Sequence, residues 1–225
     1  MNYLDFVKKY AVLPALFISG FLEANHMGLI GGESGGVGSG PAYAALISHD
    51  GVATPLTLPG IALSSTVLSA QSNQSTKGLL GGRSFSTLAA YAATVSSTGN
   101  VSPLTGLPSA GRINSVALNS SGQGLIGGQE DTLVDGFAAL VSPGEVVTPI
   151  NLLLSGTGNI LSVALNNSGL GLVGGADSGT AYAALISPGG TATVLSLPPG
   201  PPGSIVSVAL SDSGQGLIGG DEPSG

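Results

Sequence analysis

A glycine-rich pentapeptide recurs along the chain at a nearly fixed spacing. Its five copies share the pattern Gly-Leu-apolar-Gly-Gly and lie at Gly28–Gly32, Gly78–Gly82, Gly124–Gly128, Gly171–Gly175 and Gly216–Gly220. The first glycines, at positions 28, 78, 124, 171 and 216, are separated by 50, 46, 47 and 45 residues. A period of this size indicates one supersecondary unit laid down repeatedly. The sequence therefore predicts a single array of repeats rather than several unrelated domains.

Each repeat is predicted to contain four short strands, and the third copy shows them most clearly. Ile113–Leu118 is apolar and β-branched, Asn119–Gly122 has turn chemistry, and Gly124–Gly128 is a second strand whose glycines indicate close approach of a neighbour. Phe137–Ser142 and Val146–Leu152 follow as the third and fourth strands. Strands joined by tight turns in this order form an antiparallel meander.

The other copies repeat this plan. Besides the pentapeptide strands, the first copy is predicted to have strands at Tyr43–Ser48 and Val52–Leu58, and the second copy at Thr66–Ser69, Ala90–Ser96 and Asn100–Leu107. The fourth copy is predicted to have strands at Ile160–Leu165, Ala181–Ser187 and Thr191–Leu197, and the fifth at Ile205–Leu210. Residues 25–225 are thus expected to be one β-repeat domain of four copies plus a C-terminal half copy.

The apolar pattern of the strands predicts how the sheets are covered. In the segment 181–186, Ala-Tyr-Ala-Ala-Leu-Ile, both alternating sets of side chains are apolar, so both faces of the strand must be buried. No segment between the copies has helical length and period, and the sheets must therefore cover one another. We predict an all-β fold, a β-propeller-like array of four-stranded antiparallel blades with about 45–50 residues per repeat. A β-solenoid is the alternative.

The repeat also resembles known families. Residues 162–179, with an apolar strand, an Asn-Ser-Gly turn, a Leu-rich strand and an Asp-x-Gly turn, look like the first half of a WD40-type blade. Because the chain has no Trp, the similarity is one of blade plan. The recurring motifs Ser-Val-Ala-Leu-Asn and Gly-Leu-Ile-Gly-Gly also resemble repeats of bacterial surface proteins, including autotransporter passenger regions. This resemblance implies a secreted protein, or one on the bacterial cell surface or outer membrane.

The composition of the chain limits the kinds of partner that it can bind. Charged residues make up only 8% of the chain, so uncharged polar residues must form most of its solvent-exposed surface. The net charge is −7, and the five basic residues form no patch, which excludes nucleic-acid binding. The chain has no Cys and therefore no disulfides or thiolate metal sites.

Residues 1–24 differ from the rest of the chain. Lys8 and Lys9 precede a short apolar run, Ala11–Leu22, as in a secretory signal sequence. The segment also aligns with the first strand of the third copy, so a diverged first strand is the other interpretation. A membrane contact is expected only through this segment or through an anchor that the chain lacks.

The loops that follow the pentapeptides carry the candidate binding residues. They are Glu33, Arg83, Glu130, Asp131, Asp135, Asp177 and Asp221. Equivalent loops of a propeller lie on one rim, where they could bind a protein or glycan partner. We expect no metal and no cofactor, the alternative being a ring of carboxylates that holds Ca²⁺.

The motifs for catalysis are weak. No serine lies in a Gly-x-Ser-x-Gly elbow, and neither His26 nor His49 has a partner at metal-ligand spacing. The favoured function is a non-enzymatic, surface-exposed scaffold. The alternatives are a propeller-class glycan hydrolase or lyase with its acids at a channel mouth, and a fragment of a longer array. Strand two occurs in both the first and the fifth copy, which predicts an open or strained ring, or self-association through an exposed strand edge.

Overall fold

The computed structural model describes residues 28–33, 40–61, 65–73, 77–197 and 203–221. Residues 1–24, predicted to be a signal sequence or a diverged first strand, lie outside the described residues.

All regular structure in the described residues is β-strand, arranged in five antiparallel sheets. Sheet one contains β1 (Gly28–Glu33), β2 (Ala42–Ile47) and β3 (Ala53–Pro55), and sheet two contains β4 (Ser65–Ser72), β5 (Lys77–Ser84), β6 (Ala90–Ser96) and β7 (Val101–Pro103). Sheet three contains β8 (Gly111–Leu118), β9 (Gly124–Glu130), β10 (Asp135–Val141) and β11 (Val147–Pro149). Sheet four contains β12 (Gly158–Leu165), β13 (Gly171–Asp177), β14 (Thr180–Ile186) and β15 (Ala192–Val194), and sheet five contains β16 (Ser204–Leu210) and β17 (Gly216–Asp221).

This architecture confirms the predicted all-β fold built from four-stranded antiparallel sheets. The fourth strands are shorter than predicted, since β11 covers only Val147–Pro149 and its counterparts are equally short. In three of the four sheets this edge strand ends at a proline, which has no N–H to donate to a ladder. Beyond Pro149 the chain turns inward, and Ile150 and Leu152 are buried in the core.

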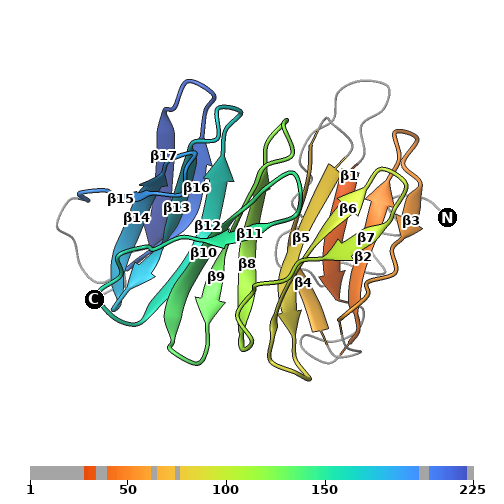
Figure 1. The fold of residues 1–225 in the computed structure, drawn as a ribbon, viewed down its shortest axis with the longest axis horizontal. Helices are drawn as coiled ribbons and strands as arrows, with labels where there is room; N and C mark the ends of the chain where they lie inside the picture. The colour runs from red at the N-terminus through yellow and green to blue at the C-terminus, as the bar shows by residue number, and fades with distance from the viewer. Residues whose placement is uncertain (1–27, 34–39, 62–64, 74–76, 198–202, 222–225) are drawn as a thin grey trace.

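The five sheets stack face to face in sequence order. Figure 1 shows them as a row from sheet one to sheet five, with the first and last sheets at opposite ends. The core lies between the sheets, where Leu79, Ile113, Ile126 and Ile160 are fully buried. Sheets that are apolar on both faces thus cover one another, as the alternating pattern predicted.

The fourth position of the first four pentapeptides is a point of close approach to the next sheet. A β-carbon placed on Gly127 would lie 2.6 Å from Cγ2 of Ile160 and 2.6 Å from Cγ1 of Val163, both on the next sheet. Gly81 and Gly174 have the same relation to the sheets that follow them. Only a residue without a side chain lets the sheets approach this closely, which confirms the predicted role of the pentapeptide glycines.

The inner edge of each sheet is protected by its neighbour. Strands β8, β12 and β16 expose N–H groups on the side away from their ladder, where unpaired donors would invite another strand. The hydroxyl of Ser115 accepts a hydrogen bond from the Val163 N–H at 3.1 Å, and Ser162 accepts one from the Val208 N–H at 3.1 Å. A serine of the preceding sheet therefore satisfies one edge N–H of β12 and one of β16.

Two buried tyrosines are expected to make the stability of the stacked sheets fall at alkaline pH. Burial raises the pKa of both Tyr91 and Tyr182 from 10.0 to about 12, with the charge of Asp177 contributing at Tyr182. The Tyr182 hydroxyl donates to the Leu152 carbonyl, a bond that requires the protonated phenol. Since the unfolded chain ionises near pH 10, the stability from the neutral phenols is complete below that pH and is lost as the pH rises toward about 12.

We therefore expect the urea midpoint to fall steeply between pH 10 and 12. A chain carrying Tyr91→Phe and Tyr182→Phe should lose most of this slope while keeping its fold at pH 8. An equally steep fall in the double variant would show that other groups cause it.

Candidate ligand-binding site

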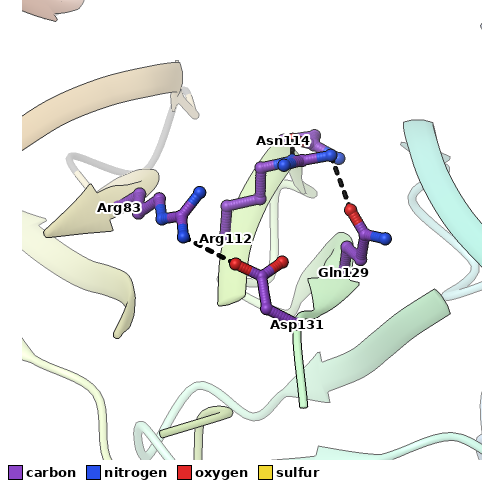
Figure 2. A network of polar contacts seen from close by, with 5 residues as sticks. All are labelled: Arg83, Arg112, Asn114, Gln129 and Asp131. Atoms are coloured by element: carbon purple, nitrogen blue, oxygen red, sulfur yellow. Dashed lines mark hydrogen bonds and ion pairs between the residues drawn. The ribbon is translucent and has the colours of Figure 1, made fainter. Parts of the chain in front are cut away.

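A set of polar side chains gathers where β5 and β9 end and β8 begins. We call this set the rim network; its members are Arg83, Arg112, Asn114, Gln129, Asp131 and Asn159. They form two bonded groups that lie side by side, one being the Arg83–Asp131 ion pair and the other the hydrogen bonds that join Arg112, Asn114, Gln129 and Asn159. Figure 2 shows all of them except Asn159. They come from three neighbouring sheets and are partly buried.

The ladder between β8 and β9 determines which side chains face each other. Arg112 pairs directly with Gln129, so their side chains lie on the same face, and Asp131 lies two residues beyond Gln129. A register shift between Ile113 and Ser115 leaves Asn114 as an inserted bulge residue. Bulges re-aim side chains, and here the bulge directs Asn114 to the Arg112 guanidinium.

Arg83 and Asp131 form an ion pair between sheets two and three. The Arg83 NH2 group donates to the Asp131 carboxylate at 2.6 Å, with side chains that are 17% and 29% exposed. Phe85 packs under the guanidinium, whose carbon atom lies 5.8 Å from the ring centroid. The Arg83 Nε atom is buried and has no hydrogen-bond partner among the described residues.

Arg112 differs from Arg83 because its partners are neutral. Its Nε donates to the Asn114 side-chain oxygen at 3.1 Å, and its NH2 group donates to the Gln129 side-chain oxygen at 2.6 Å. Within the described part of the chain, Arg83–Asp131 is the one ion pair, so no carboxylate of these residues lies within 4.0 Å of the Arg112 guanidinium nitrogens. Two uncharged amide oxygens therefore hold the guanidinium in place.

Asn114 extends the network to sheet four. Its side-chain amide donates to the Asn159 side-chain oxygen and to the Ile160 carbonyl, both at 2.8 Å. The amide oxygen that accepts from Arg112 is therefore fixed by two bonds on its other side. These bonds restrict the orientation of the Arg112 guanidinium.

The acids predicted as candidate sites do not form one cluster. Five of these six acids lie at or just beyond the end of a second strand, and Asp135 is the first residue of the third strand β10. They contact different partners. Asp131 pairs with Arg83, Glu130 accepts from Thr132 at 2.7 Å, and Asp135 accepts from the Gly136 N–H at 2.8 Å. Glu33 pairs across the ladder with Ala42.

Asp177 and Asp221 accept hydrogen bonds from residues in or next to their own sheets. Burial opposes ionisation of Asp177, but hydrogen bonds from the Ser155 N–H and hydroxyl and from the Gly156 N–H hold its pKa below the ordinary value. The Ser204 hydroxyl, at 2.6 Å, lowers the pKa of Asp221. Each carboxylate thus binds residues at or just before the start of the first strand of its own sheet.

The described residues contain no group of three or more His, Asp or Glu side chains that could hold a metal ion. A shallow groove between sheets one and two is lined by uncharged residues such as Leu46, Leu56 and Val101, and by no ionisable side chain. Among the described residues there is also no helix with the length and apolar character needed to cross a bilayer.

Four residues of the rim network were not predicted from the sequence, namely Arg112, Asn114, Gln129 and Asn159. Their signal was present in the repeat register, because Arg112 and Asn159 occupy one position and Arg83 and Gln129 occupy another. The bulge that brings Asn114 into the network has no signature in the alternation of apolar residues.

Comparisons with known proteins identify the fold. No family model matches the chain, and no curated protein matches it by sequence. Three solved structures illustrate what it resembles. Virginiamycin B lyase from Staphylococcus aureus has a TM-score of 0.60 and 12% identity, over 91% of this chain and 69% of the lyase. The Dos1 propeller has a TM-score of 0.54 and 14% identity, over 89% of this chain and 63% of that one. A gluconolactonase from Xanthomonas campestris has a TM-score of 0.52 and 13% identity, over 79% of this chain and 62% of that one.

The fold is therefore that of a β-propeller, with blades stacked in sequence order. The chain spans less than two thirds of the Dos1 propeller and of the gluconolactonase. The resemblance to bacterial surface proteins and autotransporter passengers stays a prediction.

The comparisons correct the expectation that this chain is not an enzyme. Its structural neighbours include a lyase and a gluconolactonase. The expectation rested on the absence of familiar catalytic motifs from the sequence. Since folds of this kind support catalysis, the fold offers no reason to exclude it here.

Proposed function

We propose that the rim network binds a carboxylate-bearing glycan and that the chain acts on it as a lyase. The observation that carries this proposal is the charge of Arg112, which is partly buried, held by Asn114 and Gln129, and without a carboxylate partner among the described residues. A guanidinium in this state matches a planar carboxylate with two parallel N–H groups. The neutral amides beside it suit the hydroxyl groups of a sugar.

The reaction follows from the neighbouring groups. Arg112 pairs with the substrate carboxylate and stabilises the negative charge that develops when the adjacent carbon loses its proton. Asp131, whose Oδ2 is bound to Arg83, offers its other oxygen as the base that takes this proton. The electron pair then forms a carbon–carbon double bond as the glycosidic oxygen leaves. That oxygen takes a proton from water, and the resulting hydroxide takes the proton held on Asp131, which restores the base. Arg83 holds the base in position.

The test is binding and turnover of uronic-acid oligosaccharides. Arg112→Gln is expected to weaken binding by about tenfold to a hundredfold, because a buried charged hydrogen bond is worth roughly 1.5–3 kcal/mol. Asp131→Asn should keep most of the affinity and abolish the unsaturated product, which is followed by its ultraviolet absorbance. Lys77→Gln is the matched control, because it removes one positive charge at the opposite end of β5.

Three results would contradict the proposal. The first is equal binding by Arg112→Gln and the parent chain, and the second is an equal loss in Lys77→Gln. The third is tight binding without any unsaturated product, which would exclude the lyase and favour the binding scaffold proposed from the sequence.

A further inference from the structure

The stack is held by one contact that repeats between all consecutive sheets. The leucine of each pentapeptide projects over the first glycine of the next pentapeptide along the chain. A β-carbon on Gly171, for example, would lie 2.9 Å from Cδ2 of Leu125. The four pairs are Leu29–Gly78, Leu79–Gly124, Leu125–Gly171 and Leu172–Gly216.

Sheet five presents the same features without a following sheet. Its outward face carries Ser207 and Ala209 on β16 and Leu217 and Gly219 on β17, and all four are exposed. Leu217 is 76% exposed, whereas its four counterparts in the other sheets are buried. A β-carbon on Gly219 would meet no described atom within 4 Å.

Sheet one has the complementary features on its opposite face. A β-carbon on Gly28 would contact only Ile47 among the described residues, and no leucine projects over it. Ile30 and Ile47 on this face are partly exposed. Their counterparts in sheet three, Ile126 and Val141, are buried by the preceding sheet.

We propose that the outward face of sheet five binds sheet one of a second copy of this chain, with Leu217 inserted over Gly28. The contact continues the series that already joins the five sheets, with the same leucine, glycine and serine positions. Figure 1 places sheets one and five at opposite ends of the stack, so the two faces meet between molecules. Such head-to-tail contacts give closed rings or open filaments. This inference does not depend on the proposed function.

Self-association of the full chain is the measurement, by sedimentation velocity over a wide concentration range. The parent chain should form dimers and higher species as concentration rises. Leu217→Asp should weaken the association at least roughly tenfold, the loss expected for a central apolar residue of an interface. Leu133→Asp is the matched control, because Leu133 is 70% exposed but lies in the loop between β9 and β10.

A mixing experiment tests the head-to-tail arrangement directly. Ile30→Lys places a positive charge on the sheet-one face, so neither it nor Leu217→Asp should self-associate, while an equimolar mixture should form heterodimers. Circular dichroism confirms that both variants keep the fold. A parent chain that stays monomeric, an equal loss in Leu133→Asp, or a mixture without heterodimers would overturn the proposal.

Discussion

Replacing Gly128 with alanine is expected to destabilise the chain by about 3 kcal/mol or more, the range of a severe steric insertion in a packed interior. Gly128 lies opposite Ile113, next to the bulge at Asn114. A β-carbon at this position would overlap the Arg112 carbonyl oxygen and lie 2.8 Å from the Arg112 carbonyl carbon. Because these atoms belong to the backbone, no rotamer change can relieve the clash. The ladder between β8 and β9 must open instead.

Gly144→Ala provides the control for this prediction. Its nearest neighbour would be the Ser142 hydroxyl at 3.7 Å, an ordinary van der Waals contact. Urea denaturation should show a large loss for Gly128→Ala and a change within about 0.5 kcal/mol for Gly144→Ala. Because the Arg112 carbonyl is one of the displaced groups, the rim network should be disrupted as well. Similar midpoints for the two variants would mean that the bulge geometry is wrong.

The sequence was sufficient to predict the fold because the repeat supplies five versions of the same information. The pentapeptide glycines, the turn at Asn119–Gly122 and the apolar third strands all indicate close-packed, doubly covered sheets, and the structure has them. Asp177, predicted in the loop after the fourth pentapeptide, is the last residue of β13, which extends two residues beyond the predicted strand. These features depend on interactions within one repeat or on faces that every repeat shares.

The candidate site could not be predicted in the same way because it depends on differences between repeats. Arg83, Gln129 and Ala176 occupy equivalent positions, yet only Arg83 has an acid on the next sheet within reach. The pairing of Arg83 with Asp131 requires knowing which loop of sheet three faces the end of β5. The bulge at Asn114 recurs at the equivalent position of sheets two, four and five, but the inserted residues there are Leu68, Leu161 and Val206, so only sheet three places an amide at this position.

A ladder of buried asparagines links the turns of successive sheets, and Asn166 is its central example. Its side-chain oxygen accepts from the Ser168 N–H, the Ser168 hydroxyl and the Leu170 N–H, at 3.1, 2.7 and 2.9 Å. Its amide donates to the Ser211 carbonyl of sheet five at 3.1 Å. Asn119 makes the equivalent bond to the Asn166 carbonyl at 3.3 Å. One side chain therefore closes its own turn and holds the next sheet.

Substitutions at Asn166 separate these two roles. Asn166→Ala removes every bond and leaves buried N–H groups without partners, at an expected cost of roughly 2–4 kcal/mol. Asn166→Ser should cost only about 1–2 kcal/mol. Serine is the residue at the equivalent position of sheet five, where the Ser211 hydroxyl accepts from the Gln215 N–H at 3.0 Å and closes the turn. A serine lacks the amide that reaches the next sheet, so this variant loses only the link between sheets.

Thermal and urea unfolding show whether Asn166→Ala destabilises the chain more than Asn166→Ser does. Asn167→Ala is the control. Asn167 is exposed and bonds Asp212 at the surface, so its loss should change stability by less than about 1 kcal/mol. Equal losses for alanine and serine at position 166 would assign the whole effect to the link between sheets. No loss in either would mean that the ladder is dispensable, since sheets packed through Leu172 and Gly174 would then hold sheet five without it.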